Sequence, residues 1–164
     1  RRLNSINPKE ENMQPEPSSQ RPFDFWQDHS CNFLEMAFRH DRRERLHNPD
    51  GYGKRTGECG DTVEIFLTVR EGHIQTAAFD TNGCLHTTAC ANTVVEMAAG
   101  RPPETAWEIT PEAVGVFLET LPRDHFHCAE LAVGALYLAL ASLKNAPARA
   151  GAAPSAIRNA ACPE

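Results

Sequence analysis

Two adjacent stretches of the chain, joined by a tight turn, restrict its fold more than any other feature. Residues 62–70 alternate between apolar and polar side chains, which is typical of a strand with one buried face. The apolar members are Val63, Ile65, Leu67 and Val69. Glu71-Gly72 predicts a short turn, and residues 73–81 predict the return strand of a hairpin. The two strands are then antiparallel, so the residues before the first strand lie beside those after the second.

Cysteines occupy both of these positions. Cys59 precedes the first strand and Cys84 follows the second, so we expect the two thiols at one end of the hairpin. Asp61 lies two residues beyond Cys59 in a loop that contains glycines, and their conformational freedom allows both side chains to point at one spot.

Cys84 also marks the change from strand to helix. Asn82-Gly83 predicts a turn, and a helical pattern follows it as far as Gly100. The first turn of a helix has unpaired N–H groups and the positive end of the helix dipole, so we expect a cysteine there to ionise more easily than a free thiol. The alternative is that Cys84 is a small buried side chain behind a tight turn.

An amphipathic pattern begins at Phe23. Its apolar residues follow helical spacing and predict one helix, with the charged stretch Arg39–Arg45 as a solvated continuation. Asn48-Pro49 predicts the end of this helix, because proline disfavours helical conformation in the residue before it.

Two more helices are expected in the second half of the chain. Thr110-Pro111 predicts a helix start, and Leu121-Pro122 closes that helix. The last helix runs from about Asp124 to Leu143 and is apolar on most sides, so we expect it to be buried. His127 and Cys128 lie in its first turn, which again places a cysteine at a helix N-terminus.

Composition limits the class of protein. The net charge of −6 argues against a nucleic-acid surface, which needs a basic patch. The longest apolar stretch, residues 129–141, is shorter than the roughly 20 residues of a membrane helix. We therefore expect a cytoplasmic protein with neither nucleic acid nor membrane as a partner. Its six cysteines are then free thiols or metal ligands rather than disulfides.

The ends of the chain differ from its middle. Residues 1–22 are rich in proline and polar side chains and predict a disordered segment. Residues 23–144 form the predicted domain, and residues 145–164 predict a loose tail rich in alanine, proline and glycine.

Five side chains could therefore act together on a soft metal or an iron–sulfur cluster. They are Cys59, Asp61, Cys84, His127 and Cys128. A thiol enzyme with one nucleophilic cysteine and a histidine base is the rival interpretation, although three converging cysteines exceed what such an enzyme needs. Cys31 and Cys162 are expected to have no chemical role, and Cys90 is expected to pack in the interior.

Three motifs resemble those of the U-type iron–sulfur scaffold family, which comprises IscU and the N-terminal domain of NifU. They are "ECGDTVEIFLTV", "FDTNGC" and "LPRDHFHCAELA", in that order along the chain. The resemblance implies an α+β fold, with a small antiparallel sheet packed against several helices. It also implies that Cys59, Asp61, Cys84 and Cys128 take the cluster-ligand positions, and that His127 takes the position of the histidine before the last cysteine.

The function that this resemblance implies is assembly and transfer rather than enzymatic turnover. A cysteine desulfurase would supply sulfur, an iron donor would supply iron, and a transient [2Fe–2S] cluster would pass to acceptor apo-proteins; a homodimer is left open. The alternative is a zinc-bound sulfur-acceptor protein of the SufU kind, because zinc suits the same donors.

The chain departs from the family pattern at two places. Leu85 and His86 follow the "GC" motif, where the family usually has small residues. The "LPPVK" stretch of many members is "LPRDH" here, so that His125 replaces a lysine. We assign His86 a solvated or supporting role at the site.

Overall fold

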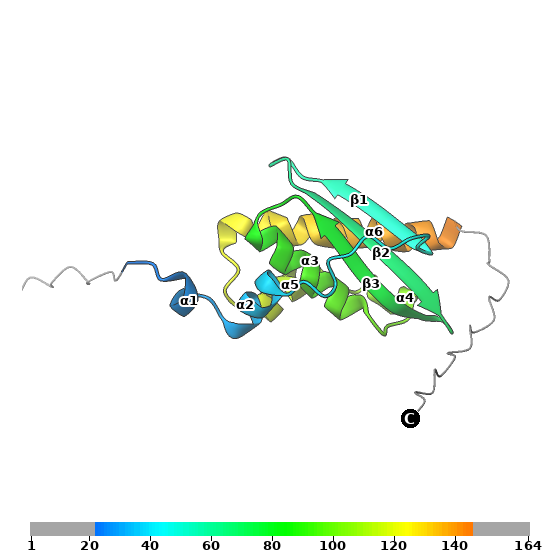
Figure 1. Ribbon diagram of the computed structural model, residues 1–164, viewed down its shortest axis with the longest axis horizontal. Helices are drawn as coiled ribbons and strands as arrows, with labels where there is room; N and C mark the ends of the chain where they lie inside the picture. Colours follow the sequence, from blue (N-terminus) through cyan, green and yellow to red (C-terminus); the bar gives the residue numbers. More distant parts are fainter. Residues whose placement is uncertain (1–21, 146–164) are drawn as a thin grey trace, which may run out of the picture.

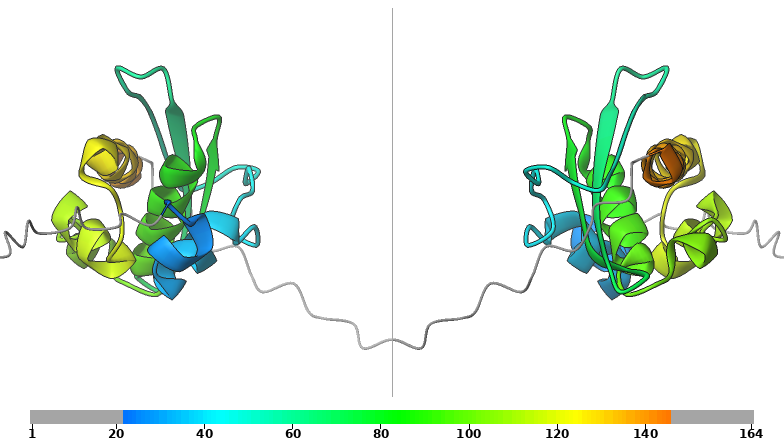
Figure 2. Two further views of the ribbon diagram at one scale, coloured as in Figure 1. Left: turned by 90° about the vertical axis from the view of Figure 1, so that its left-hand side faces the viewer. Right: turned by 90° about the vertical axis from the view of Figure 1, so that its right-hand side faces the viewer.

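A three-stranded antiparallel sheet in the order β1-β2-β3 organises the fold, and helices α3 and α6 lie on the same side of it (Figures 1 and 2). The computed structural model describes residues 22–145. The predictions for residues 1–22 and 145–164 therefore lie almost wholly outside the described residues. The α+β class and the small antiparallel sheet are confirmed. The strands are β1 (Gly51–Thr56), β2 (Thr62–Arg70) and β3 (His73–Thr81).

The predicted hairpin is confirmed residue by residue. β2 and β3 pair with Val63 opposite Thr81 and Arg70 opposite His73. Its apolar face points into the core, where Val63, Ile65 and Leu67 are fully buried. The hairpin therefore places the segment 57–61, before β2, beside the segment 82–84, after β3, as expected.

Strand β1 was not predicted, because its sequence lacks a run of large apolar residues. Its buried positions are Gly51 and Gly53, and they alternate with the exposed Tyr52 and Lys54. A Cβ at Gly51 would lie 2.7 Å from the carbonyl oxygen of Ala139, and one at Gly53 would overlap the α6 backbone. The two glycines therefore allow β1 to lie directly against α6.

The single helix expected from Phe23 is wrong; the chain forms two helices there. They are α1 (Phe25–Asp28) and α2 (Cys31–Phe38). Ser30 starts the second helix, because its side-chain oxygen accepts a hydrogen bond from the Phe33 N–H while its hydroxyl donates to the Leu118 carbonyl. A hydroxyl in the middle of the apolar stripe thus acts as a helix cap.

The stretch Arg39–Arg45 is largely exposed, as expected, but it is not helical. The chain leaves α2 at Phe38 and runs beside β3, where Arg43 forms a bridge with Phe79. The arginines are paired: Arg42 lies 2.8 Å from Glu96, and Arg45 lies 2.8 Å from Glu64. These ion pairs hold the segment along the edge of the sheet.

The later elements are α3 (Leu85–Ala98), the short α4 (Pro103–Ala106), α5 (Pro111–Leu118), the 3-10 turn η1 (Arg123–His125) and α6 (Phe126–Asn145). Of these, α3, α5 and α6 lie where helices were expected, whereas α4 and the turn η1 were not predicted, and α6 begins at Phe126, two residues after the expected start. Thr110 caps α5 by accepting from the Ala113 N–H. By length and hydropathy the stretch Arg123–Leu143 could cross a membrane, but half of it is buried inside the protein, as in a core helix.

The contact between β1 and α6 yields a stability prediction. Gly53→Ala places a methyl group on the α6 backbone, and overpacking of this kind costs about 1–3 kcal/mol. We expect the free energy of unfolding, measured by urea denaturation, to fall by at least about 2 kcal/mol. The control is Gly57→Ala, whose nearest contact would be an ordinary 3.5 Å. Equal losses in both variants would contradict the close approach.

Candidate metal centre

Three segments far apart in the sequence meet at one end of the sheet. The loop between β1 and β2 carries Cys59 and Asp61, the β3–α3 junction carries Cys84, and the start of α6 carries His127 and Cys128. Figure 1 shows the first turns of α3 and α6 at the same end of the molecule, and Figure 2 views them from that end. The predicted site residues are therefore gathered in one region, but not in one uniform cluster.

Asp61 fixes the β1–β2 loop to the start of α3. Its Oδ2 accepts a hydrogen bond from the Cys84 N–H at 3.3 Å and another from the Thr87 hydroxyl at 2.7 Å. A carboxylate at a helix N-terminus is also favoured by the helix dipole. Gly83 is required for this approach, because a Cβ there would lie 2.7 Å from Asp61 Oδ2.

Thr87 links the two cysteines on the helices. Its Oγ1 lies 3.5 Å from Cys84 Sγ and 3.3 Å from Cys128 Sγ. A hydroxyl carries one hydrogen, so it can donate to only one of the carboxylate and the sulfurs at a time. Thr87 was missed in the sequence, where it is one threonine among several in an apolar helix.

Cys128 does not match the expectation of an easily ionised thiol. It is fully buried, and burial raises its pKa to about 11, although the hydrogen bond from Thr87 acts in the opposite direction. Here desolvation outweighs the helix dipole. Cys84 is the N-terminal cap residue of α3 and is exposed, so the structure does not bear out the alternative of a small buried side chain.

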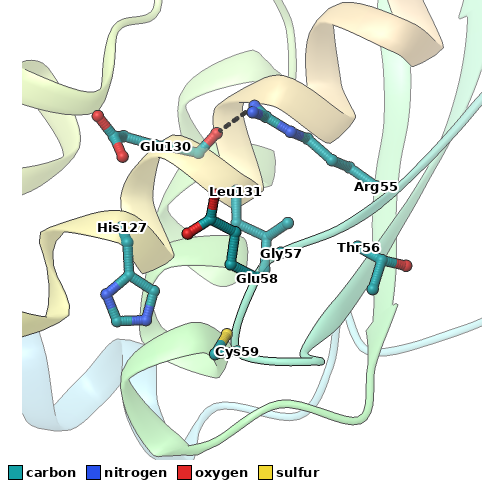
Figure 3. Close-up of a pocket in the computed structure, with 8 residues that line it drawn as sticks. All are labelled: Arg55, Thr56, Gly57, Glu58, Cys59, His127, Glu130 and Leu131. Carbon is teal, nitrogen blue, oxygen red and sulfur yellow. Dashed lines mark hydrogen bonds between the residues drawn. The ribbon is translucent and has the colours of Figure 1, made fainter.

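Within the described residues, Cys59 makes no hydrogen bond to Cys84, Cys128 or Thr87. It is exposed and lines a cleft of about 580 Å³ together with His127, Glu130 and Leu131 (Figure 3). Arg55 crosses the same cleft and donates a hydrogen bond to the Glu130 carbonyl.

His127 lies between this cleft and Cys128. Its Nδ1 is 2.9 Å from the Asp124 carbonyl oxygen, which favours a proton on that nitrogen. Its Nε2 is 3.6 Å from Cys128 Sγ, so this nitrogen faces the sulfur. His127 thus connects the cleft that contains Cys59 with the sulfur of Cys128.

His125 was not among the predicted ligands, yet the structure places it in the tightest group of donors. Within the described residues, the donor atoms of Cys84, His125 and Cys128 all lie within 4.8 Å of one another. The sequence held a signal for this, because residues three apart at a helix start face the same side. His125 and Cys128 have that spacing.

His86 supports His125 rather than facing solvent alone. The two rings stack with centroids 3.8 Å apart and an angle of 7° between their planes. Burial, followed by the neighbouring His125 and His29, lowers the pKa of His86 to about 4, so its ring is neutral at neutral pH. The supporting role expected for His86 is compatible with this arrangement.

The cysteines without an assigned role also have clear places. Cys90 is fully buried in the core, where burial raises its pKa, and its predicted packing role is confirmed. Cys31 is exposed as the first residue of α2. Cys162 lies outside the described residues.

Comparison with known proteins identifies relatives by sequence. The model of the family described as "NifU-like N terminal domain" matches residues 45–150. Two iron-sulfur cluster assembly scaffold proteins from Archaeoglobus fulgidus, IscU 1 and IscU 2, are each 35% identical over 97 residues, which cover 58% of this chain and 63% of theirs. The nitrogen fixation protein NifU of Azotobacter chroococcum is 28% identical over 114 residues, covering 62% of this chain and 37% of NifU. The chain thus spans less than two thirds of the length of these relatives.

Solved structures confirm the fold. A scaffold protein for the SUF system from Fervidobacterium islandicum has a TM-score of 0.59 at 16% identity and covers 71% of this chain and 99% of that one. The NifU-like N-terminal protein of Brucella abortus also has a TM-score of 0.59, at 18% identity, over 71% of this chain and 94% of its own.

The burial of Cys128 yields a prediction about thiol reactivity in the metal-free protein. A pKa of about 11 leaves few thiolates at pH 8, so iodoacetamide should label Cys128 at least about tenfold more slowly than the exposed Cys84. Raising the pH toward 10 should speed the labelling of Cys128 steeply, because the thiolate fraction rises about tenfold per pH unit below the pKa. Peptide mass spectrometry measures both rates, with exposed Cys31 as the internal reference. Equal rates at pH 8 would show that Cys128 is accessible and readily ionised.

Proposed function

The chain belongs to the family of NifU-like N-terminal domains, and from this premise we propose that it is a scaffold for iron–sulfur cluster assembly. Iron and sulfur are its cargo: the cluster forms on the protein and then passes to acceptor proteins. The observation that carries the proposal is the convergence of Cys59, Asp61, Cys84 and Cys128 at one end of the sheet. The protein acts as a carrier and does not turn over a small substrate.

The donor set favours a cluster that can leave. A ferredoxin that keeps its cluster for electron transfer uses four cysteine thiolates. Here three cysteines are combined with Asp61, whose hard carboxylate oxygen holds iron less firmly than a thiolate does. Asp61 is also engaged by Thr87 and by the Cys84 N–H, so other hydrogen bonds compete for its oxygens. We propose that Cys59, Asp61, Cys84 and Cys128 hold a [2Fe–2S] cluster and that His127 can replace Asp61.

We assign sulfur delivery to an exposed thiol, and of the two cysteines at the starts of α3 and α6 only Cys84 is exposed. A cysteine desulfurase presents sulfur as a persulfide, and a scaffold thiolate attacks the outer sulfur and releases the desulfurase thiolate, with no net oxidation. Cys84 is exposed and Cys128 is fully buried, so we propose Cys84 as the first acceptor. Two electrons from an external reductant then convert each transferred sulfur to sulfide, and an iron donor supplies Fe²⁺.

A zinc-bound sulfur-acceptor protein of the SufU kind is the second candidate function. It is favoured by the close grouping of Cys84, His125 and Cys128, since cysteine and histidine donors suit tetrahedral zinc. The absorption spectrum of protein purified without oxygen separates the two functions. Visible charge-transfer bands indicate a cluster, whereas a colourless protein that contains one zinc ion indicates the alternative.

Single substitutions test the cluster ligands. Cys59→Ser, Cys84→Ser and Cys128→Ser should each abolish stable cluster loading in anaerobic reconstitution, measured by iron and sulfide content and by visible absorption. Cys31→Ser is the matched control, because this exposed cysteine lies on α2. Full loading of Cys59→Ser would remove Cys59 from the ligand set, and loss of loading in Cys31→Ser would overturn the proposed site.

Asp61→Ala tests the exchangeable ligand. Loss of the carboxylate removes the position that incoming groups reach most easily, so cluster transfer to an apo-ferredoxin should slow by about tenfold or more at equal initial loading. Circular dichroism followed over time measures the transfer. Asp50→Ala is the control, since this carboxylate pairs with Arg70 near the β2–β3 turn, at the opposite end of the hairpin. Unchanged or faster transfer by Asp61→Ala contradicts the labile role.

A further inference from the structure

The site contains a compact group of three donors that leaves Cys59 outside. Within the described residues, the donor atoms of Cys84, His125 and Cys128 lie within 4.8 Å of one another, and this group does not include Cys59, Asp61 or His127. Two sulfur ligands of a tetrahedral zinc ion lie roughly 3.8 Å apart, given a Zn–S bond of about 2.3 Å. The three donors therefore need to close by only about 1 Å to surround a single ion, which rotation of side chains can supply.

The ring of His125 presents one nitrogen without a partner. Its Nδ1 is buried and makes no hydrogen bond in the described structure. A buried polar atom of this kind is costly unless it gains a partner. The other nitrogen, Nε2, lies 3.9 Å from the carboxylate of Asp124. This distance is too long for a hydrogen bond, but a rotation of the exposed Asp124 side chain would let it accept from Nε2–H and leave Nδ1 free to bind a metal.

The orientation of this ring is set by stacked aromatic groups. The His86 ring lies parallel to the His125 ring, with their centroids 3.8 Å apart. The centroid of the His86 ring also lies 5.5 Å from that of Phe33 and 6.1 Å from that of His29. Phe33 is fully buried, so the stack is attached to the core. His29 is held in turn by a contact of its Nδ1 with the Thr120 hydroxyl at 3.3 Å.

We propose that Cys84, Cys128 and Nδ1 of His125 bind a single divalent ion, Zn²⁺ or Fe²⁺, with His86 as the positioning residue that holds the His125 ring. The fourth position of the tetrahedron is open, as in sites that accept an incoming group. Thr87 Oγ1 lies within 3.5 Å of both sulfurs and can donate a hydrogen bond to a metal-bound thiolate.

If the proposed function holds, this three-donor site receives the first iron ion before Cys59 takes part in assembly. That role rests on the proposed function. The ligand set itself does not depend on that function. His127 does not belong to the group, although its Nε2 faces Cys128, because it is not within 4.8 Å of both sulfurs. His125 and His127 thus both neighbour Cys128 but differ in their relation to Cys84, and a loss of Zn²⁺ binding in His127→Ala but not in His125→Ala would overturn the assignment of His125.

The test measures metal binding in the absence of sulfur. Zn²⁺ affinity is determined anaerobically by competition with a chromophoric chelator, and Co²⁺ serves as the spectroscopic probe of ligand number and type. His125→Ala should lower Zn²⁺ affinity by more than about 100-fold, beyond the 10–100-fold typical of a residue that only supports a ligand, and should reduce the tetrahedral Co²⁺ bands. Cys31→Ser and His73→Ala change an exposed thiol on α2 and an exposed histidine at the β2–β3 turn, and they should stay within about threefold of the unchanged protein. A larger loss in either control than in His125→Ala overturns the ligand assignment.

A second pair of variants tests the stack and guards against misfolding. His86→Ala should weaken Zn²⁺ binding by about tenfold, and His86→Phe should restore it, because a phenyl ring can stack but cannot bind metal. Failure of His86→Phe to restore binding would show that His86 is itself a ligand and overturn its positioning role. If His125→Ala does not keep the circular dichroism spectrum and melting temperature of the metal-free parent, His125→Gln replaces it in the test. Strong Zn²⁺ binding by a folded His125→Gln protein would also overturn the proposal.

Failure of this proposal is distinguishable from failure of the proposed function. If the unchanged protein binds Zn²⁺ through His125 but assembles and transfers no cluster, the scaffold function is wrong and the metal site stands. If clusters assemble normally while His125→Ala has no effect on the binding of either metal, the metal site is wrong and the scaffold function stands.

Discussion

The close approach of strand β1 to helix α6 is the constraint on which the site depends. It is possible only because glycine occupies positions 51 and 53, where any side chain would meet the helix backbone. With β1 laid against α6, the first turn of that helix reaches the end of the sheet at which the β1–β2 loop and the β3–α3 junction also lie. This contact helps to fix Cys128 relative to Cys59 and Cys84, together with the packing of α6 on α3 and β2.

Within this frame, hydrogen bonds connect the donors before any metal arrives. Asp61 is bound by the Cys84 N–H and by Thr87, and Thr87 contacts both Cys84 and Cys128. A site assembled in this way has its donors positioned in advance, so binding does not have to order the loop and both helices at once. The donors also differ in exposure: Cys59 and Cys84 are exposed, whereas Cys128 lies in the interior. Ligands at the rim and at the base of the site therefore meet solvent and partners differently.

The sequence could predict the parts of this structure that depend on local pattern. Strands β2 and β3 and the starts of α3 and α5 follow from alternation, turn residues and caps, and the motifs around Cys59, Cys84 and Cys128 indicated residues that gather at one end of the sheet. Strand β1 could not be found in this way, because its buried positions are glycines that show no apolar signal. The break between α1 and α2 was missed because Ser30 lies within the apolar stripe but forms a cap through a partner, Leu118, that only the tertiary fold supplies.

His125 and Thr87 were missed for a similar reason, since their importance arises from residues 26–41 positions away in sequence. The raised pKa of Cys128 likewise reflects burial, which outweighs the helix N-terminus that the sequence made visible.

The separation of one exposed and one buried thiol has a consequence for damage by oxidants. At this site peroxide would meet the exposed Cys59 and Cys84 before the buried Cys128, and a sulfenic acid formed on Cys84 would be reversible, whereas further oxidation to a sulfinic acid is not. The sulfur of Cys128 lies within 4.8 Å of Cys84 Sγ, close enough to condense with the sulfenic acid and form a disulfide that thiols can reduce. We expect the buried cysteine to act as a resolving thiol for Cys84, so that thiols could return an oxidised molecule to use.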